Sequence, residues 1–248
     1  MNMTWGFFSA AHILSLLLGV GMIVALYFLL KNAGTTVQTI VLGVLSFSGI
    51  AAIIFNLVYW DSPLEYLPLH LCSLNAMMLP IAVFTRNKTI NNLLLLWSLG
   101  ALIALFLNNS VAEAEILSWT FVFYYFPHVL EFGIPILMFL LKLVKKDVKC
   151  IGTTLGITLA SYTVIHFINL WINSYTAANN ILDWAGNVIK VNYMYSMFPD
   201  NPVLALFYHI LPYEYWYMLL AIVVIAVYLV FVYLVDIIKL AKNKNTVS

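Results

Sequence analysis

The chain has 248 residues, of which 64% are hydrophobic and only 8% are charged, and its formal net charge is +1. A soluble domain carries roughly 25% charged residues, so this composition excludes a soluble enzyme. It predicts an all-α integral membrane protein that forms one membrane domain over residues 1–248. No basic stripe with interleaved aromatic residues indicates nucleic acid, and the two cysteines give no disulfide framework.

Long apolar runs indicate the membrane-spanning helices, each of which needs about 20 mostly apolar residues. Seven such runs are present, at approximately residues 6–30, 37–60, 64–84, 90–107, 116–141, 151–172 and 203–238. The first run lacks the basic flank of a signal peptide, so we interpret it as a span. Pro212 is expected to kink the last run or to separate a short helix from it.

The basic residues support this count and orient the chain. Ten of the eleven Lys and Arg residues follow alternate spans: Lys31, Arg86, Lys88, Lys142, Lys145, Lys146, Lys149, Lys239, Lys242 and Lys244. The remaining loops hold acidic residues and Lys190. Because cytoplasmic loops carry an excess of Lys and Arg, the pattern predicts an external N-terminus and a cytoplasmic C-terminus.

All the histidines lie inside apolar runs, as does one of the two cysteines: His12, His70, His128, His166, His209 and Cys72. Ionisable groups in hydrocarbon are costly and usually face a bundle interior or a wet cavity. In the predicted orientation the histidines are skewed towards the outer half of the membrane, so we expect an outward-facing polar site. The long loop of about residues 173–202 is on the same side, as an ordered cap or as an aromatic belt.

Cys72 is the candidate nucleophile, and it needs a base or a cation to supply its thiolate. His70 is a poor partner within a helix, because residues two positions apart point about 200° apart. His128 has a comparable depth, roughly 18 Å from the outer surface against roughly 12 Å for Cys72. Glu131 follows one turn after His128 and could orient the imidazole, which predicts a catalytic Cys72–His128–Glu131 arrangement. The alternative is a His–Glu pair that satisfies itself between helices.

The other polar residues of the spans have several possible roles. His166, with Asn169 one turn later, and His209 could line the same cavity, bind a lipid headgroup or form hydrogen bonds between helices. His12 is expected at the membrane interface. Cys150 is expected at the cytoplasmic end of the sixth span, away from Cys72.

Three classes of function stay open on these residues. A cysteine enzyme is the first, and a transporter or ligand-binding protein that uses intramembrane histidines is the second. A metal-dependent enzyme is the third, since three histidines can bind zinc, although no HExxH motif is present. A rhodopsin is excluded because the last span holds no lysine in its interior for a retinal Schiff base. No cofactor, acyl-CoA or ATP motif is visible.

Three segments of the chain together resemble a known family. The segments LPLHLCSLNAMMLP, FPHVLEF and NYMYSMFPDNP are similar to those of the YwaF-like bacterial integral membrane proteins. The eukaryotic relatives of that family include an acyltransferase of ether phospholipid (plasmalogen) metabolism. The resemblance covers nearly the whole chain in length, number of spans and order of the motifs.

This resemblance implies an acyltransferase that works through a cysteine and a histidine, which fall on Cys72 and His128. His128 would take the proton of Cys72, and the thiolate would attack a phospholipid ester. An acceptor hydroxyl would then take the acyl chain from the thioester. We expect glycerophospholipids of the cell membrane as substrates and no cofactor, while the oligomeric state stays open. The residues expected to contact substrate are His70, Asn75, His166, Asn192, Tyr193 and His209.

Overall fold

The computed structural model describes residues 4–107 and 111–245, and their side chains as far as residue 238. Within these residues the chain is helical and contains no β-strand, only isolated bridges between Thr4 and Glu115 and between Leu182 and Val188. Six helical segments of the described residues are long and apolar enough to cross a membrane, with Thr35–Tyr59 taken as one segment, and Leu71–Thr85 is a shorter apolar helix. The prediction of an all-α, multi-pass membrane protein is therefore confirmed.

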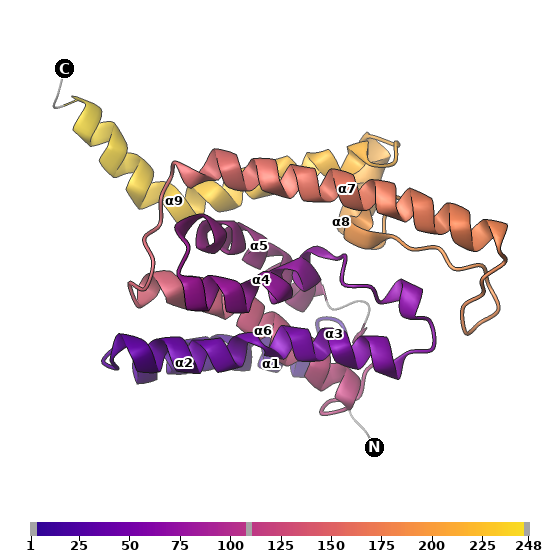
Figure 1. Ribbon diagram of the computed structural model, residues 1–248, viewed down its shortest axis with the longest axis horizontal. Helices are drawn as coiled ribbons and strands as arrows, with labels where there is room; N and C mark the ends of the chain where they lie inside the picture. The colour runs from indigo at the N-terminus through magenta and orange to yellow at the C-terminus, as the bar shows by residue number, and fades with distance from the viewer. Residues whose placement is uncertain (1–3, 108–110, 246–248) are drawn as a thin grey trace. The chain divides into compact units, whose positions relative to one another are not determined.

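The chain forms two compact units, Met1–Lys145 and Lys146–Ser248 (Figure 1). The first contains α1 (Ala10–Leu30), α2 (Thr35–Ser46), α3 (Ser48–Tyr59), the short 3-10 helix η1 (Pro63–Glu65), α4 (Leu71–Thr85), α5 (Lys88–Leu107) and α6 (Trp119–Leu140). The second contains α7 (Cys150–Ala178), η3 (Tyr193–Tyr195), α8 (Pro202–Ile210), η4 (Trp216–Leu220) and α9 (Ala221–Asn245). That residues 1–248 form one domain stays a prediction.

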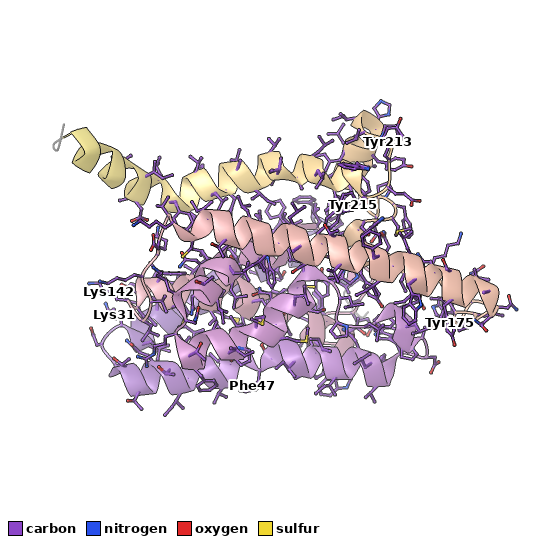
Figure 2. All side chains as sticks on the ribbon, turned by 45° about the horizontal axis from the view of Figure 1, so that its top comes forward. Lys31, Phe47, Lys142, Tyr175, Tyr213 and Tyr215 are labelled. Carbon is purple, nitrogen blue, oxygen red and sulfur yellow. The ribbon has the colours of Figure 1, made fainter. Side chains whose placement is uncertain are left out.

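The second predicted span is broken in its middle, at Phe47, which is labelled in Figure 2. Just before the break, the Ser46 hydroxyl donates to the carbonyl of Gly43 at 2.6 Å. Such bonds from serine back to the preceding turn bend helices. Ser48 and Gly49 follow, and both residue types are weak helix formers. Local sequence thus explains why α2 and α3 are separate helices.

The third span begins later than predicted. We expected helix from residue 64, but α4 starts at Leu71 and the preceding residues form η1 and an irregular segment. Pro68 provides the reason, because the residue before a proline is disfavoured in helical conformation. The 15 residues of α4 extend about 22 Å, short of the roughly 30 Å of the hydrocarbon layer. Cys72 therefore lies in the first turn of a helix rather than well inside one.

Two boundaries differ in the second unit. The long loop begins at residue 179 rather than 173, because α7 continues to Ala178. Pro212 does separate a short helix, since α8 ends at Ile210. The three lysines predicted to mark the cytoplasmic end, Lys239, Lys242 and Lys244, have side chains outside the described residues, and the orientation stays a prediction.

In the first unit α6 packs against α1, α3, α4 and α5. Only residues 86–87 join α4 to α5, which makes this pair antiparallel. Helix α5 is also antiparallel to α6, because the Tyr124 hydroxyl donates to Ala104 at 2.9 Å and the Asn92 amide donates to Lys145 at 3.4 Å. Helices α4 and α6 therefore run in the same direction. Figure 2 shows Lys31 and Lys142 at one end of this unit, so α1 runs that way too.

Candidate functional site

Cys72 is the second residue of α4 and is half-buried. The Ser73 hydroxyl and the backbone N–H groups of the first turn lie close to its sulfur. The first N–H groups of a helix have no partner within the helix and carry its positive dipole end. This end of the helix favours a negative charge on the sulfur, whereas burial and the nearby Glu131 carboxyl oppose one, so a thiolate here needs a base.

His70 has a different setting from the one we expected. It is the residue before α4, and its backbone is extended, with φ −75° and ψ 156°. The argument that a helix turns His70 away from Cys72 therefore does not apply. The imidazole of His70 is half-buried beside the first turn of α4, where a contact with substrate stays a prediction.

His128 is held by the turn before it in α6. Its Nδ1 lies 2.7 Å from the carbonyl oxygen of Tyr124, and the two rings are 4.3 Å apart between centroids. A carbonyl oxygen only accepts, so Nδ1 carries the hydrogen. The neutral imidazole then has its lone pair on Nε2, which is the tautomer that a general base needs. The ring is half-buried.

Glu131 and Asn75 are almost fully buried, with 3% and 0% of their surface exposed. The Asn75 side-chain amide donates to the backbone carbonyl of Glu131 at 3.2 Å, which joins α4 to α6. The Glu131 carboxyl lies beside Gly49 of α3 and is close enough to Cys72 for their charges to interact. The Nδ1 position of His128 is occupied by Tyr124, so any role of Glu131 in the chemistry works through another contact and stays a prediction.

The contact between Asn75 and Glu131 sets the relative height of α4 and α6. Because the two helices are parallel, residues one turn earlier on each lie at the same height. Those residues are Cys72 and His128. The predicted nucleophile and the predicted base thus have a similar height on two helices that pack together, and their pairing stays a prediction.

Gly49 leaves room for the Glu131 carboxyl, and we expect Gly49→Ala to destabilise the first unit. A Cβ at this position would lie 2.5 Å from the Cβ of Ala76 and 2.8 Å from Oε1 of Glu131. Overpacking of this kind costs about 1–3 kcal/mol. The measurement is the thermal unfolding midpoint of the purified protein in lipid. Gly21→Ala is the matched control, since a Cβ at Gly21 of α1 would meet nothing within 4 Å. Equal midpoints for the two variants would contradict this packing.

Aromatic side chains surround the C-terminal end of α3 and the N-terminal end of α6. Phe55 stacks on Phe123 with 4.3 Å between ring centroids, and Trp60 stacks on Tyr66 at 5.6 Å. Burial and the neighbouring Glu65 raise the pKa of Tyr66, which lies in the segment before α4. These rings form an apolar wall at this end of the first unit.

In the second unit the predicted residues hold the loop onto α7. Asn169 is fully buried, and its amide exchanges hydrogen bonds of 2.8 and 3.0 Å with the backbone of Tyr193. It also donates to the Ser196 hydroxyl at 2.9 Å, and that oxygen is 3.0 Å from Nδ1 of His166. Asn173 contacts Val191 in the same way, at 2.7 and 3.0 Å. Residues 189–196 therefore run back along one face of α7.

Asn192 and Tyr193 have their polar groups engaged within this unit. The side-chain oxygen of Asn192 accepts from the backbone N–H groups of Met197 and Phe198, and its side-chain NH2 donates to the backbone carbonyl of Phe198. Tyr193 is 1% exposed. These contacts close the loop. Binding of substrate by either residue stays a prediction.

The remaining histidines are in contrasting settings. His209 is exposed in the last turn of α8. His12, which we expected at the membrane interface, is wholly buried, and its ring contacts the carbonyl of Leu105 at 2.8 Å and the N–H of Phe8 at 3.0 Å. It is buried because the N-terminal segment folds back over α1, and its depth relative to the membrane interface stays a prediction. Among the described residues no group of three or more His, Cys, Asp and Glu could hold a metal ion.

The sequence reasoning missed three residues of this site: Gly49, Ser73 and Tyr124. Tyr124 acts through its backbone carbonyl, which no side-chain pattern reports, and Ser73 lies close to the Cys72 sulfur because both stand in the first turn of α4. Gly49 did carry a signal, since a glycine inside an apolar helical run often marks a close approach of another element.

Comparison with known proteins gave one match. The model of a family described as the TMEM164 family matches residues 7–232, which is most of the chain. Neither the curated proteins nor the solved structures gave a match.

Proposed function

The chain belongs to the TMEM164 family, and from this membership and the residues above we propose that it is a membrane acyltransferase. Its substrates are glycerophospholipids, and it moves fatty-acyl chains between them. The motif resemblance to the YwaF-like proteins and to the plasmalogen acyltransferase supports this chemistry. In the predicted orientation the site lies in the outer half of the cell membrane.

One observation carries the proposal. Cys72 stands in the first turn of α4, near the positive end of that helix, and the neighbouring α6 carries an imidazole whose Nε2 holds a lone pair. This combines a nucleophile that needs a base with a base in the required tautomer.

The reaction has two steps. Nε2 of His128 takes the thiol proton, and the Cys72 sulfur attacks the ester carbonyl of a phospholipid. The lysolipid leaves with the proton that His128 returns to its oxygen, and the acyl chain stays on sulfur as a thioester. In the second step His128 takes the proton of an acceptor hydroxyl, whose oxygen attacks the thioester and frees the thiolate, to which the proton returns.

The surroundings of the pair favour transfer to lipid over hydrolysis. The aromatic wall of α3 and α6 is apolar, and a site that excludes water protects a thioester intermediate. In the first unit His70, beside the first turn of α4, is the candidate for contact with the substrate headgroup, while Asn75 is fully buried. His166, Asn192, Tyr193 and His209 of the second unit are separate candidates for contact with lipid.

The intact mass of the protein purified in native lipid tests this proposal. We expect a fatty-acyl adduct on the wild type and on Cys150→Ser that neutral hydroxylamine removes, and no adduct on Cys72→Ser. Because the adduct can turn over quickly, the same masses are taken for His128→Ala and after addition of phospholipid. An unmodified Cys72 thiol in every condition would contradict the covalent mechanism and favour a lipid-binding protein or transporter.

A further inference from the structure

An unusual group of polar atoms lies one turn beyond Cys72 and His128. The described residues contain four buried side-chain oxygens without a hydrogen-bond partner, and three are in the first unit: Ser48 Oγ, Asn75 Oδ1 and Glu131 Oε2. The fourth, on Asp236, is 3.0 Å from the Lys146 ammonium. Buried polar groups are nearly always paired, so the three oxygens around Gly49 require an explanation.

An ionised Glu131 would leave this group unsatisfied. A carboxylate has only acceptor oxygens, and the carbonyl oxygen of Asn75 also only accepts, so the two cannot bond to each other. No lysine or arginine of the first unit stands at this depth, because all of them lie at or beyond helix ends: Lys31, Arg86, Lys88, Lys142 and Lys145. The histidine one turn earlier, His128, binds the Tyr124 carbonyl through its Nδ1. Glu131 is about 14 Å along α6 from the end near Lys142. A bare charge here would be costly.

A single proton would pair two of these three oxygens, those of Glu131 and Asn75. We propose that Glu131 rests as a neutral carboxylic acid whose Oε2–H donates to Oδ1 of Asn75. The amide of Asn75 already donates to the backbone carbonyl of Glu131 at 3.2 Å. Asn75 then forms two hydrogen bonds with Glu131, one to its backbone carbonyl and one from its carboxyl group, and we call this pair of bonds the clamp. Gly49 leaves space for Oε1 of Glu131.

This inference rests on the proposed function for its purpose. The clamp joins α4 to α6 one turn from the reacting pair, so it keeps Cys72 and His128 at the same height. A neutral Glu131 also leaves no negative charge beside the thiolate that forms on Cys72, where a carboxylate would oppose it. Glu131 is therefore a positioning residue, and the group that orients His128 is the Tyr124 carbonyl.

Infrared difference spectra of the protein in lipid at neutral pH test the proton directly. We expect the carbonyl band of a protonated carboxylic acid in the wild type, lost in Glu131→Gln and moved to higher frequency in Asn75→Leu, where its acceptor is gone. Glu113→Gln is the matched control, because Glu113 is exposed in a loop and its replacement should leave the band in place. Wild-type and Glu131→Gln spectra with the same acid band would overturn the inference.

Acyl-transfer rates provide a second readout. The side-chain amide of Gln can still donate to Asn75, whereas Leu leaves its oxygen unpaired, so we expect Glu131→Leu to be slower than Glu131→Gln by about tenfold or more. Equal rates would contradict the clamp. The two proposals can be contradicted separately. An acid band without an acyl adduct on Cys72 would contradict only the proposed acyltransferase. An acyl adduct without the acid band would contradict only the proposed hydrogen bond between Glu131 and Asn75.

Discussion

Cys72→Ser is expected to lower acyl transfer by roughly a thousandfold or more, since removal of a nucleophile usually removes most of the catalysis. A serine hydroxyl is far less acidic than a thiol, so His128 would have to abstract its proton against a larger barrier. The donors at the start of α4 cannot compensate, because they stabilise charge only after the proton has left. The measurement is transfer of a labelled acyl chain from a phospholipid to a lysophospholipid in proteoliposomes.

Cys150→Ser is the matched control for this experiment. Cys150 is the buried first residue of α7, in the other unit, and its substitution should leave the transfer rate unchanged. The thermal unfolding midpoint of Cys72→Ser should stay near that of the wild type, because serine is accepted in the first turn of a helix. Transfer by Cys72→Ser at the wild-type rate would rule out a covalent intermediate on this residue.

Much of the fold could be predicted because hydrocarbon selects long apolar runs, and these runs set the positions of α1, α5 and α6 closely. Hydrophobicity alone does not distinguish helix from irregular backbone. Residues 64–70 contain three leucines and were included in the predicted span, yet Pro68 and the stacking of Tyr66 on Trp60 keep them out of α4. Asn173 was predicted to begin the loop but lies within α7. Its side-chain amide forms hydrogen bonds with the backbone of Val191 in the returning loop.

The candidate site was predictable in its residue types but not in its geometry. Depth estimates separated Cys72 and His128 by roughly 6 Å, and the late start of α4 with its Asn75–Glu131 contact brings the two to the same height. The role expected for Glu131, to orient the imidazole of His128, also differs from the contacts found. A carboxylate one turn after a histidine is typical of an orienting partner, but the backbone carbonyl one turn before His128 already binds its Nδ1. Sequence patterns do not report backbone acceptors. Only the structure therefore shows that the Tyr124 carbonyl, and not the Glu131 carboxyl, binds Nδ1 of His128.

His128→Asn should separate catalysis from packing at this position. The amide nitrogen of Asn reaches about as far as Nδ1 of histidine, so it can keep the hydrogen bond to the Tyr124 carbonyl. It offers no basic atom in place of Nε2. We therefore expect the fold to persist while acyl transfer falls by about 10²–10⁴-fold, the usual contribution of a general acid–base group.

The pH dependence of transfer supplies the check on this assignment. An imidazole accepts a proton only in its neutral form, so the wild-type rate should fall as the pH is lowered and His128 becomes protonated. The residual rate of His128→Asn should lack that decline. Unfolding midpoints would establish that both proteins are folded under the assay conditions. If His128→Asn transfers acyl chains at the wild-type rate, then the imidazole serves only to bind Tyr124, and the base must be sought elsewhere near Cys72, first at His70 before the same helix.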